Sequence, residues 1–244
     1  MHSSIGLTRR RFVELSGLST AGLVLAGSEG AGPVLTADST SKPRANLTPD
    51  QILRKLLEGN KRFIKGIPAN PRRKPEDFAK LEEGQKPMAV IVGCADSRVA
   101  PEILFDQGVG DLFVVRVAGN VINGAGATVK GSIEYAVAEL AVSLVVVLGH
   151  SKCGAVKSAL KHIDAKDSLP GAINDLVNNI KPAVTKTKGQ KGDALENAIK
   201  ANVEIGVERI KDLKPILAGP VKEGKVKVVG GVYDLRSGEV TIIS

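Results

Sequence analysis

Four apolar runs with few polar interruptions recur between residues 88 and 234. The first three are nearly continuous, which is typical of strands that are covered on both faces. A shorter run near the end predicts a final edge strand. In order, the runs are MAVIVGC (88–94), DLFVVRV (111–117), SLVVVLGH (143–150), KVKVVGGVYD (225–234) and EVTII (239–243).

Segments with helical periodicity separate these runs. Each places its apolar residues on one helical face. Because strands alternate with helices, the pattern predicts an α/β fold with a central, mostly parallel β-sheet flanked by helices. The two clearest faces consist of Val129, Ile133, Ala136, Val137 and Leu140, and of Leu195, Ile199, Val203, Val207 and Ile210.

An amphipathic helix is expected before the first strand. Thr48 is a suitable N-cap, Pro49 suits the first helical position, and Gln51 completes a capping box. We therefore predict an N-terminal helical arm, followed by an irregular basic crossing over residues 68–77. The apolar stripe of the arm comprises Ile52, Leu56 and Phe63.

The beginning of the chain has the pattern of an export signal. The basic cluster TRRRFVEL (8–15) precedes a modest apolar stretch, SGLSTAGLVLAG (16–27), which is too short and glycine-rich to span a membrane as a helix. Paired arginines before Phe12 resemble a bacterial twin-arginine signal. The alternative is a disordered basic tail.

From this pattern we expect residues 1–37 to form a signal peptide and linker, with cleavage after Ala26 or Ala37. Residues 38–244 would then form a single domain. The mature protein would be periplasmic or otherwise extracytoplasmic, with no stable membrane span after signal removal. A metal loaded before export would protect both cysteines from oxidation there.

Composition narrows the choice of partners. Of the 244 residues, 43% are hydrophobic but only 3% are aromatic, and tryptophan is absent, so Val, Ile, Leu and Ala must fill the core. The formal net charge is +8. The basic residues are dispersed and stacking aromatics are scarce, so we expect a solvated basic surface and no nucleic-acid binding.

Metal-capable residues close two of the apolar runs. Cys94 ends one run and is followed by Asp96, while His150 ends another and is followed by Cys153. Sites in open α/β sheets form beyond the carboxyl ends of strands, so these side chains are expected to meet. Three such ligands with a free fourth position are typical of catalytic zinc. A closed structural zinc site, or cysteines buried as small hydrophobes, are the alternatives.

The motifs CADSR and GHSKCGA resemble those of the beta-class carbonic anhydrases. The similarity spans roughly residues 48–244 and includes LLEGNKRF, FDQGVGDLFVVRVAGN and GSIEYAV. The resemblance implies a lyase with one zinc ion per subunit, held by Cys94, His150 and Cys153. It would hydrate CO2 reversibly to bicarbonate and a proton through zinc-bound hydroxide. Hydrolysis of carbonyl sulfide or carbon disulfide on the same scaffold, or non-catalytic zinc binding, are the alternatives.

The resemblance also assigns Asp96 and Arg98 as a catalytic pair. Asp96 would bind zinc as a fourth ligand in a closed state, or turn to Arg98 in an open state. A pH-regulated subgroup of the family needs a tryptophan near this motif, where this chain has Ile91. We therefore expect the open state at neutral pH. From the motif alone, an ion pair that merely stabilises a turn is the alternative.

The substrate pocket follows from the same resemblance. Gln85 would donate a hydrogen bond to substrate oxygen, and Phe113, Tyr135 and Gly154 would line the pocket. Tyr135 points away from the apolar face of its helix, which suggests burial against a second subunit, although an exposed or locally packed ring is equally compatible. The family forms homodimers that can pair into tetramers. No proton shuttle is identified, and His162 is left unassigned.

Overall fold

The structure, a computed structural model, describes residues 47–122, 126–165 and 167–244. The predicted signal segment and the predicted domain boundary at residue 38 lie outside these residues. Within them, no helix has both the length and the apolar character needed to cross a membrane.

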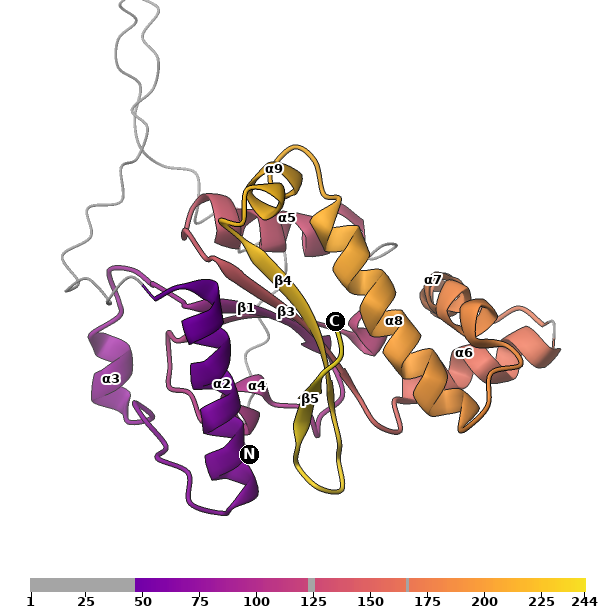
Figure 1. Cartoon of the computed structure of the whole chain (residues 1–244), viewed down its shortest axis with the longest axis horizontal. Helices are drawn as coiled ribbons and strands as arrows, with labels where there is room; N and C mark the ends of the chain where they lie inside the picture. Colours follow the sequence, from indigo (N-terminus) through magenta and orange to yellow (C-terminus); the bar gives the residue numbers. More distant parts are fainter. Residues whose placement is uncertain (1–46, 123–125, 166) are drawn as a thin grey trace, which may run out of the picture. The chain divides into compact units, whose positions relative to one another are not determined.

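The central sheet has five strands in the order β2-β1-β3-β4-β5 (Figure 1). The first four strands run parallel, and β5 pairs antiparallel to β4 at one edge. The mostly parallel sheet and its edge strand are therefore confirmed, and every strand end lies within two residues of the end of its predicted run. The strands are β1 (Ala89–Cys94), β2 (Leu112–Val117), β3 (Leu144–His150), β4 (Lys227–Tyr233) and β5 (Val240–Ile242).

Helices connect the strands, and the three helices with the clearest periodicity lie where predicted. The arm helix α2 begins with the expected capping box, in which the Thr48 hydroxyl accepts from the Gln51 N–H at 3.3 Å and the Gln51 side chain accepts from the Thr48 N–H at 2.7 Å. The longer helices are α2 (Pro49–Ile64), α5 (Gly126–Ala138), α6 (Gly154–Ala165), α7 (Ala172–Thr187) and α8 (Ala194–Lys211).

Short helical turns also lie where the pattern predicts irregular chain. The expected irregular crossing over residues 68–77 is wrong at its end, because Pro75 occupies the first position of a short helix rather than interrupting one. The short elements are α3 (Pro75–Ala79), α4 (Pro101–Leu104), the 3₁₀ turn η1 (Ala118–Asn120) and α9 (Ala218–Lys222).

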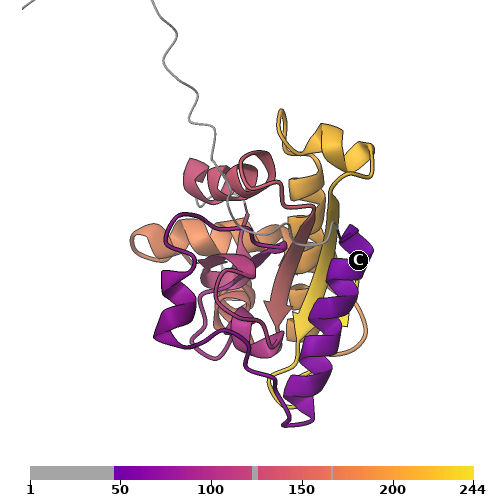
Figure 2. The ribbon, with the colours of Figure 1, turned by 90° about the vertical axis from the view of Figure 1, so that its left-hand side faces the viewer.

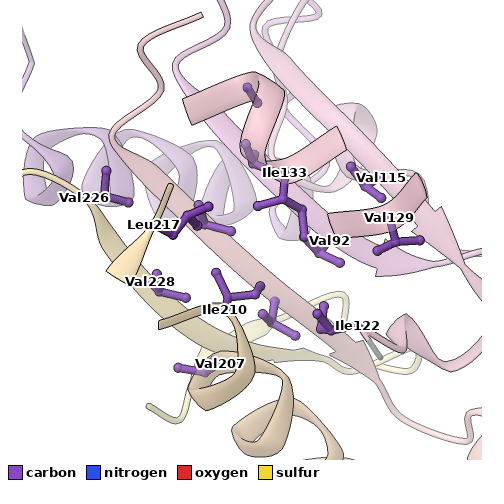
Figure 3. Close-up of a cluster of buried hydrophobic side chains, with 14 of the residues drawn as sticks. Val92, Val115, Ile122, Val129, Ile133, Val207, Ile210, Leu217, Val226 and Val228 are labelled. Atoms are coloured by element: carbon purple, nitrogen blue, oxygen red, sulfur yellow. The ribbon is translucent and has the colours of Figure 1, made fainter. Parts of the chain in front are cut away.

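Alternate residues of the buried strands face two different cores. Val90 and Val92 of β1 pack with α5 and α8, as Figure 3 shows for Val92, whereas Ala89 and Ile91 pack with α2 and α4 on the other face. Helices α2 and α8 accordingly lie on opposite sides of the sheet (Figures 1 and 2). This two-sided burial explains why the strands read as continuous apolar runs.

A third apolar cluster lies beyond the carboxyl ends of β1 and β3. Both cysteines belong to it, together with residues of α6, α7 and the first half of α8. The buried members from the helices are Val156, Ala159, Val177, Ile180, Val184, Ala198 and Ile199. These helices therefore enclose the end of the sheet at which the predicted metal ligands emerge.

Candidate metal centre

Three potential metal ligands meet at the carboxyl ends of neighbouring strands. Cys94 is the last residue of β1, His150 is the last residue of β3, and Cys153 immediately precedes α6. Their ligand atoms all lie within 4.8 Å of one another. The side chains are enclosed, with 4%, 0% and 1% of the respective residues exposed. The structure thus brings together the three residues that the sequence nominated.

His150 is oriented with one ring nitrogen toward this cluster. Its Nδ1 lies 3.0 Å from the carbonyl oxygen of Ser151, a contact in which Nδ1 carries the proton and donates it. The lone pair is then on Nε2, which is buried and has no hydrogen-bond partner among the described residues. An orphaned imidazole nitrogen beside two free thiols suits a zinc ion, which prefers nitrogen and sulfur ligands.

The pKa values of the two thiols shift in opposite directions. A hydrogen bond from the Cys153 thiol is the largest influence that lowers the pKa of Cys94, and the backbone N–H groups of Asp96 and Gly119 lower it further. The same contact, together with burial, raises the pKa of Cys153. The geometry therefore favours the thiolate at Cys94, and Cys153 would have to lose its proton to bind a metal as well.

Asp96 and Arg98 form a two-pronged ion pair at the rim of the cluster. Arg98 donates from Nε to Asp96 Oδ1 at 2.9 Å and from Nη2 to Oδ2 at 2.7 Å. These bonds are the main reason why the pKa of Asp96 lies below its ordinary value. Asp96 Oδ2 is 3.8 Å from His150 Nε2, so the carboxylate borders the ligand cluster while it faces the arginine. This is the arrangement expected of the open state.

Two supporting residues were not singled out from the sequence. Arg116 on β2 donates to the carbonyl oxygens of Cys94 at 3.0 Å and Asp96 at 2.5 Å, which fixes the loop between them. Gly119 donates its N–H to the Cys94 sulfur at 3.2 Å. Arg116 could have been noticed as the one arginine inside the apolar run DLFVVRV. Gly119 could not, because a backbone donor leaves no signal in the sequence.

The residues expected to bind substrate do not all lie near this centre within one chain. Gln85 is exposed and lines a surface hollow of ≈ 390 Å³ before β1 begins. All of β1, about 17 Å at 3.3 Å per residue, separates that end of the sheet from Cys94. Gly154, in contrast, directly follows Cys153 at the start of α6.

Phe113 and Tyr135 form an aromatic pair toward the same distant end of the sheet. Their ring centroids are 6.2 Å apart with the planes tilted by 39°. Phe113 pairs with Val90 in the sheet, four positions before the pairing of Val117 with Cys94. Tyr135 is 49% exposed, in agreement with its predicted orientation away from the apolar face of α5.

Comparisons with known proteins found similar sequences over most of the chain. Residues 89–240 match the family model described as carbonic anhydrase. Carbonic anhydrase 2 of Mycobacterium tuberculosis is 42% identical over 198 residues, which cover 81% of this chain and 94% of that protein.

Solved structures of the same kind share the fold. The Coccomyxa beta-carbonic anhydrase in complex with acetazolamide has a TM-score of 0.60 at 28% identity, covering 78% of this chain and 86% of that one. A structure from a study of two tetrameric beta-carbonic anhydrases of Sordaria macrospora has a TM-score of 0.62 at 26% identity, covering 70% and 88%.

Proposed function

Because this chain belongs to the carbonic anhydrase family, as an enzyme of the beta class, we propose that Cys94, His150 and Cys153 hold its zinc ion and that Asp96 and Arg98 complete the active site. The reaction of the family is the reversible, zinc-dependent conversion of CO2 and water to bicarbonate and a proton. The observation that carries the assignment of residues is the buried His150 Nε2, which lies between two free thiols and the Asp96 carboxylate without a partner among the described residues.

Zinc bound at this cluster would supply a Lewis acid that makes a nucleophile from water near neutral pH. The protein would contribute to this chemistry by holding the three ligands in fixed positions. The carbonyl of Ser151 holds the tautomer of His150, and the Gly119 N–H stabilises the Cys94 thiolate. Burial of all three ligands keeps bulk water from competing for them.

Asp96 orients the attacking water. Because Arg98 keeps the pKa of Asp96 low, the carboxylate stays ionised and accepts a hydrogen bond without retaining the proton. The bidentate contact also holds the carboxylate away from the cluster, so that it does not occupy the position that water needs. The side chain of Arg98 is 54% exposed and that of Asp96 is 17% exposed, so substrate approaches from this side.

A homodimer would complete the substrate pocket. Gln85, Phe113 and Tyr135 lie toward the end of the sheet away from Cys94, so they can serve a metal centre only if that centre belongs to a second copy. β2, which carries Phe113, is an edge strand, and the exposed ring of Tyr135 lies against Phe113. The tetrameric state reported for the Sordaria enzymes supports association of this kind.

Export by a twin-arginine signal is the proposed route to the extracytoplasmic compartment. It is supported by the basic and apolar segments of residues 8–27. Replacing Arg9 and Arg10 together by lysine should leave the protein in the cytoplasm of a bacterial host, as fractionation and immunoblotting would show. Unchanged export of that double variant, or a wild-type protein that is never exported, would contradict this route.

Stopped-flow measurement of CO2 hydration, with zinc content measured in parallel, tests the assignment of residues. Cys153→Ser should lose zinc and activity together. Asp96→Asn should keep zinc and lose at least about 10²-fold in kcat, because the oriented acceptor is weakened. Full activity in Cys153→Ser after zinc removal would exclude the proposed centre.

A further inference from the structure

The sulfur of Cys94 accepts hydrogen bonds from two backbone N–H groups. Asp96 donates at 3.4 Å and Gly119 at 3.2 Å. Donors of this kind stabilise the thiolate and moderate the charge that it passes to a bound metal. Asp96 lies two residues from the cysteine, so the chain itself keeps its donor near. Gly119 lies in the turn η1 after β2, 25 residues from Cys94, so other contacts must hold its N–H near the sulfur.

The backbone at Gly119 has a conformation that few residues could adopt. Its φ of 68° and ψ of 18° lie in the left-handed region. A Cβ atom there would be 2.8 Å from Ile180 Cδ1 and 3.1 Å from the Cβ of Ala155. Glycine permits this close approach, but it also has the greatest conformational freedom of any residue. The backbone preference of glycine does not by itself keep this N–H directed at the Cys94 sulfur, so a tertiary contact is needed.

Within the described part of the chain, Asn202 makes the one side-chain hydrogen bond to the carbonyl oxygen of Gly119. Its Nδ2 donates to the Gly119 carbonyl oxygen at 2.8 Å, across 83 residues of sequence. Asn202 lies inside α8 and is only 5% exposed, between the buried Ala201 and Val203. Asparagine is a poor helix former, and a buried amide is costly unless it is hydrogen-bonded. The hydrogen bond to Gly119 therefore offsets the cost of burying the Asn202 amide among apolar residues.

We propose that Asn202 is a positioning residue of the metal centre, which acts through Gly119 on the sulfur of Cys94. With the carbonyl of Gly119 held by α8 and its Cα packed against α6 and α7, the N–H on the other side of the same residue has little freedom to turn. Asn202 thus links the helix layer to the charge on a metal ligand. The inference rests on the proposed function in that it takes Cys94 to bind zinc.

Metal affinity and a spectroscopic signature test this role. Asn202→Leu keeps the volume but removes the donor, and should weaken zinc binding by about 10–100-fold in chelator competition. In the cobalt(II)-substituted protein, the thiolate-to-cobalt charge-transfer bands should shift, because the sulfur loses a fixed donor. Asn202→Ala provides a second variant if the larger side chain does not fold.

Val207→Ala is the matched control. Val207 is also buried on α8, but it packs against the sheet in another cluster. This variant should be less stable than wild type, but its metal affinity and its charge-transfer bands should be unchanged. Asn202 variants that bind zinc as tightly as wild type, with unshifted bands, would overturn the inference. A wild-type cobalt protein without thiolate bands would instead overturn the proposed ligand set itself.

Discussion

At the scale of single residues, the carboxylate of Asp96 stands between a guanidinium and the buried imidazole of His150. Two charge-assisted hydrogen bonds hold it on Arg98. Its distance of 3.8 Å from His150 Nε2 is short enough that a rotation about its side-chain bonds would bring it among the metal ligands. If these residues act as proposed, Arg98 decides whether Asp96 orients water or competes with it.

Arg98→Gln tests this dependence. Without the guanidinium the pKa of Asp96 rises toward its ordinary value, and the carboxylate is free to move to the metal. We expect zinc content to stay near one per subunit while kcat at pH 7.5 falls at least about 10²-fold. Arg54→Gln, at an exposed position on α2, should leave both unchanged. Wild-type kcat in Arg98→Gln would show that the pair only stabilises a turn.

At the scale of elements, a buried carboxylate fastens the end of α2 to the turn after α4. Asp106 accepts from Arg62 Nε at 2.6 Å and from the N–H groups of Ala69 and Asn70, each at 2.9 Å. Burial raises the pKa of Asp106, but these donors outweigh it, and the net shift is downward. A depressed folded-state pKa stabilises the fold above the unfolded-state value of about 3.9. That stabilisation is lost as the pH falls through the folded-state pKa.

Asp106→Asn should therefore lower the free energy of unfolding by about 1–3 kcal/mol at pH 7. It should also reduce the difference in stability between pH 7 and pH 3, since the titrating group is gone. Urea unfolding at both pH values measures this. Asp50→Asn, which removes an exposed ion pair with Lys227, should leave stability nearly unchanged at both pH values. Equal pH dependence in Asp106→Asn and wild type would contradict the assignment.

Two helical glycines should respond oppositely to alanine. At Gly59 on α2, an added Cβ would lie 1.8 Å from the Phe105 carbonyl oxygen, so α2 must move away from the sheet layer. At Gly131 on α5, no atom of the described residues lies within 4 Å of an added Cβ. Thermal unfolding should show Gly59→Ala destabilised by at least about 3 kcal/mol. Gly131→Ala should be stabilised by about 0.5–1 kcal/mol, because alanine is the better helix former. Similar changes in both variants would refute the proposed close approach of α2.

The strands and the periodic helices could be predicted because burial on two faces leaves continuous apolar runs, as in MAVIVGC. α7 was not predicted, although Val177, Ile180 and Val184 recur at helical spacing, because an internal proline such as Pro182 usually argues against a helix. The metal ligands could be nominated because they close strands whose ends meet. Gly119 and Asn202 could not, because a backbone donor and its distant anchor share no spacing in the sequence.

At the scale of the whole molecule, the position of the aromatic pair makes activity depend on association. Phe113 and Tyr135 lie far from Cys94 within one chain, so we expect a wild-type dimer or larger assembly in solution. Tyr135→Glu should shift sedimentation velocity profiles toward the monomer and lower CO2 hydration, with zinc retained. Ile173→Glu, on the 54% exposed Ile173 of α7, should leave assembly unchanged. A monomeric, fully active wild-type enzyme would contradict the shared pocket.

We expect one zinc ion to be held by two sulfurs and one imidazole at the ends of β1 and β3. X-ray absorption at the zinc edge, on the purified protein at pH 7.5, tests this most directly. We expect two sulfur neighbours at about 2.3 Å and light atoms, including one imidazole nitrogen, at about 2.0–2.1 Å. A zinc shell with no sulfur, or with only one, would contradict it.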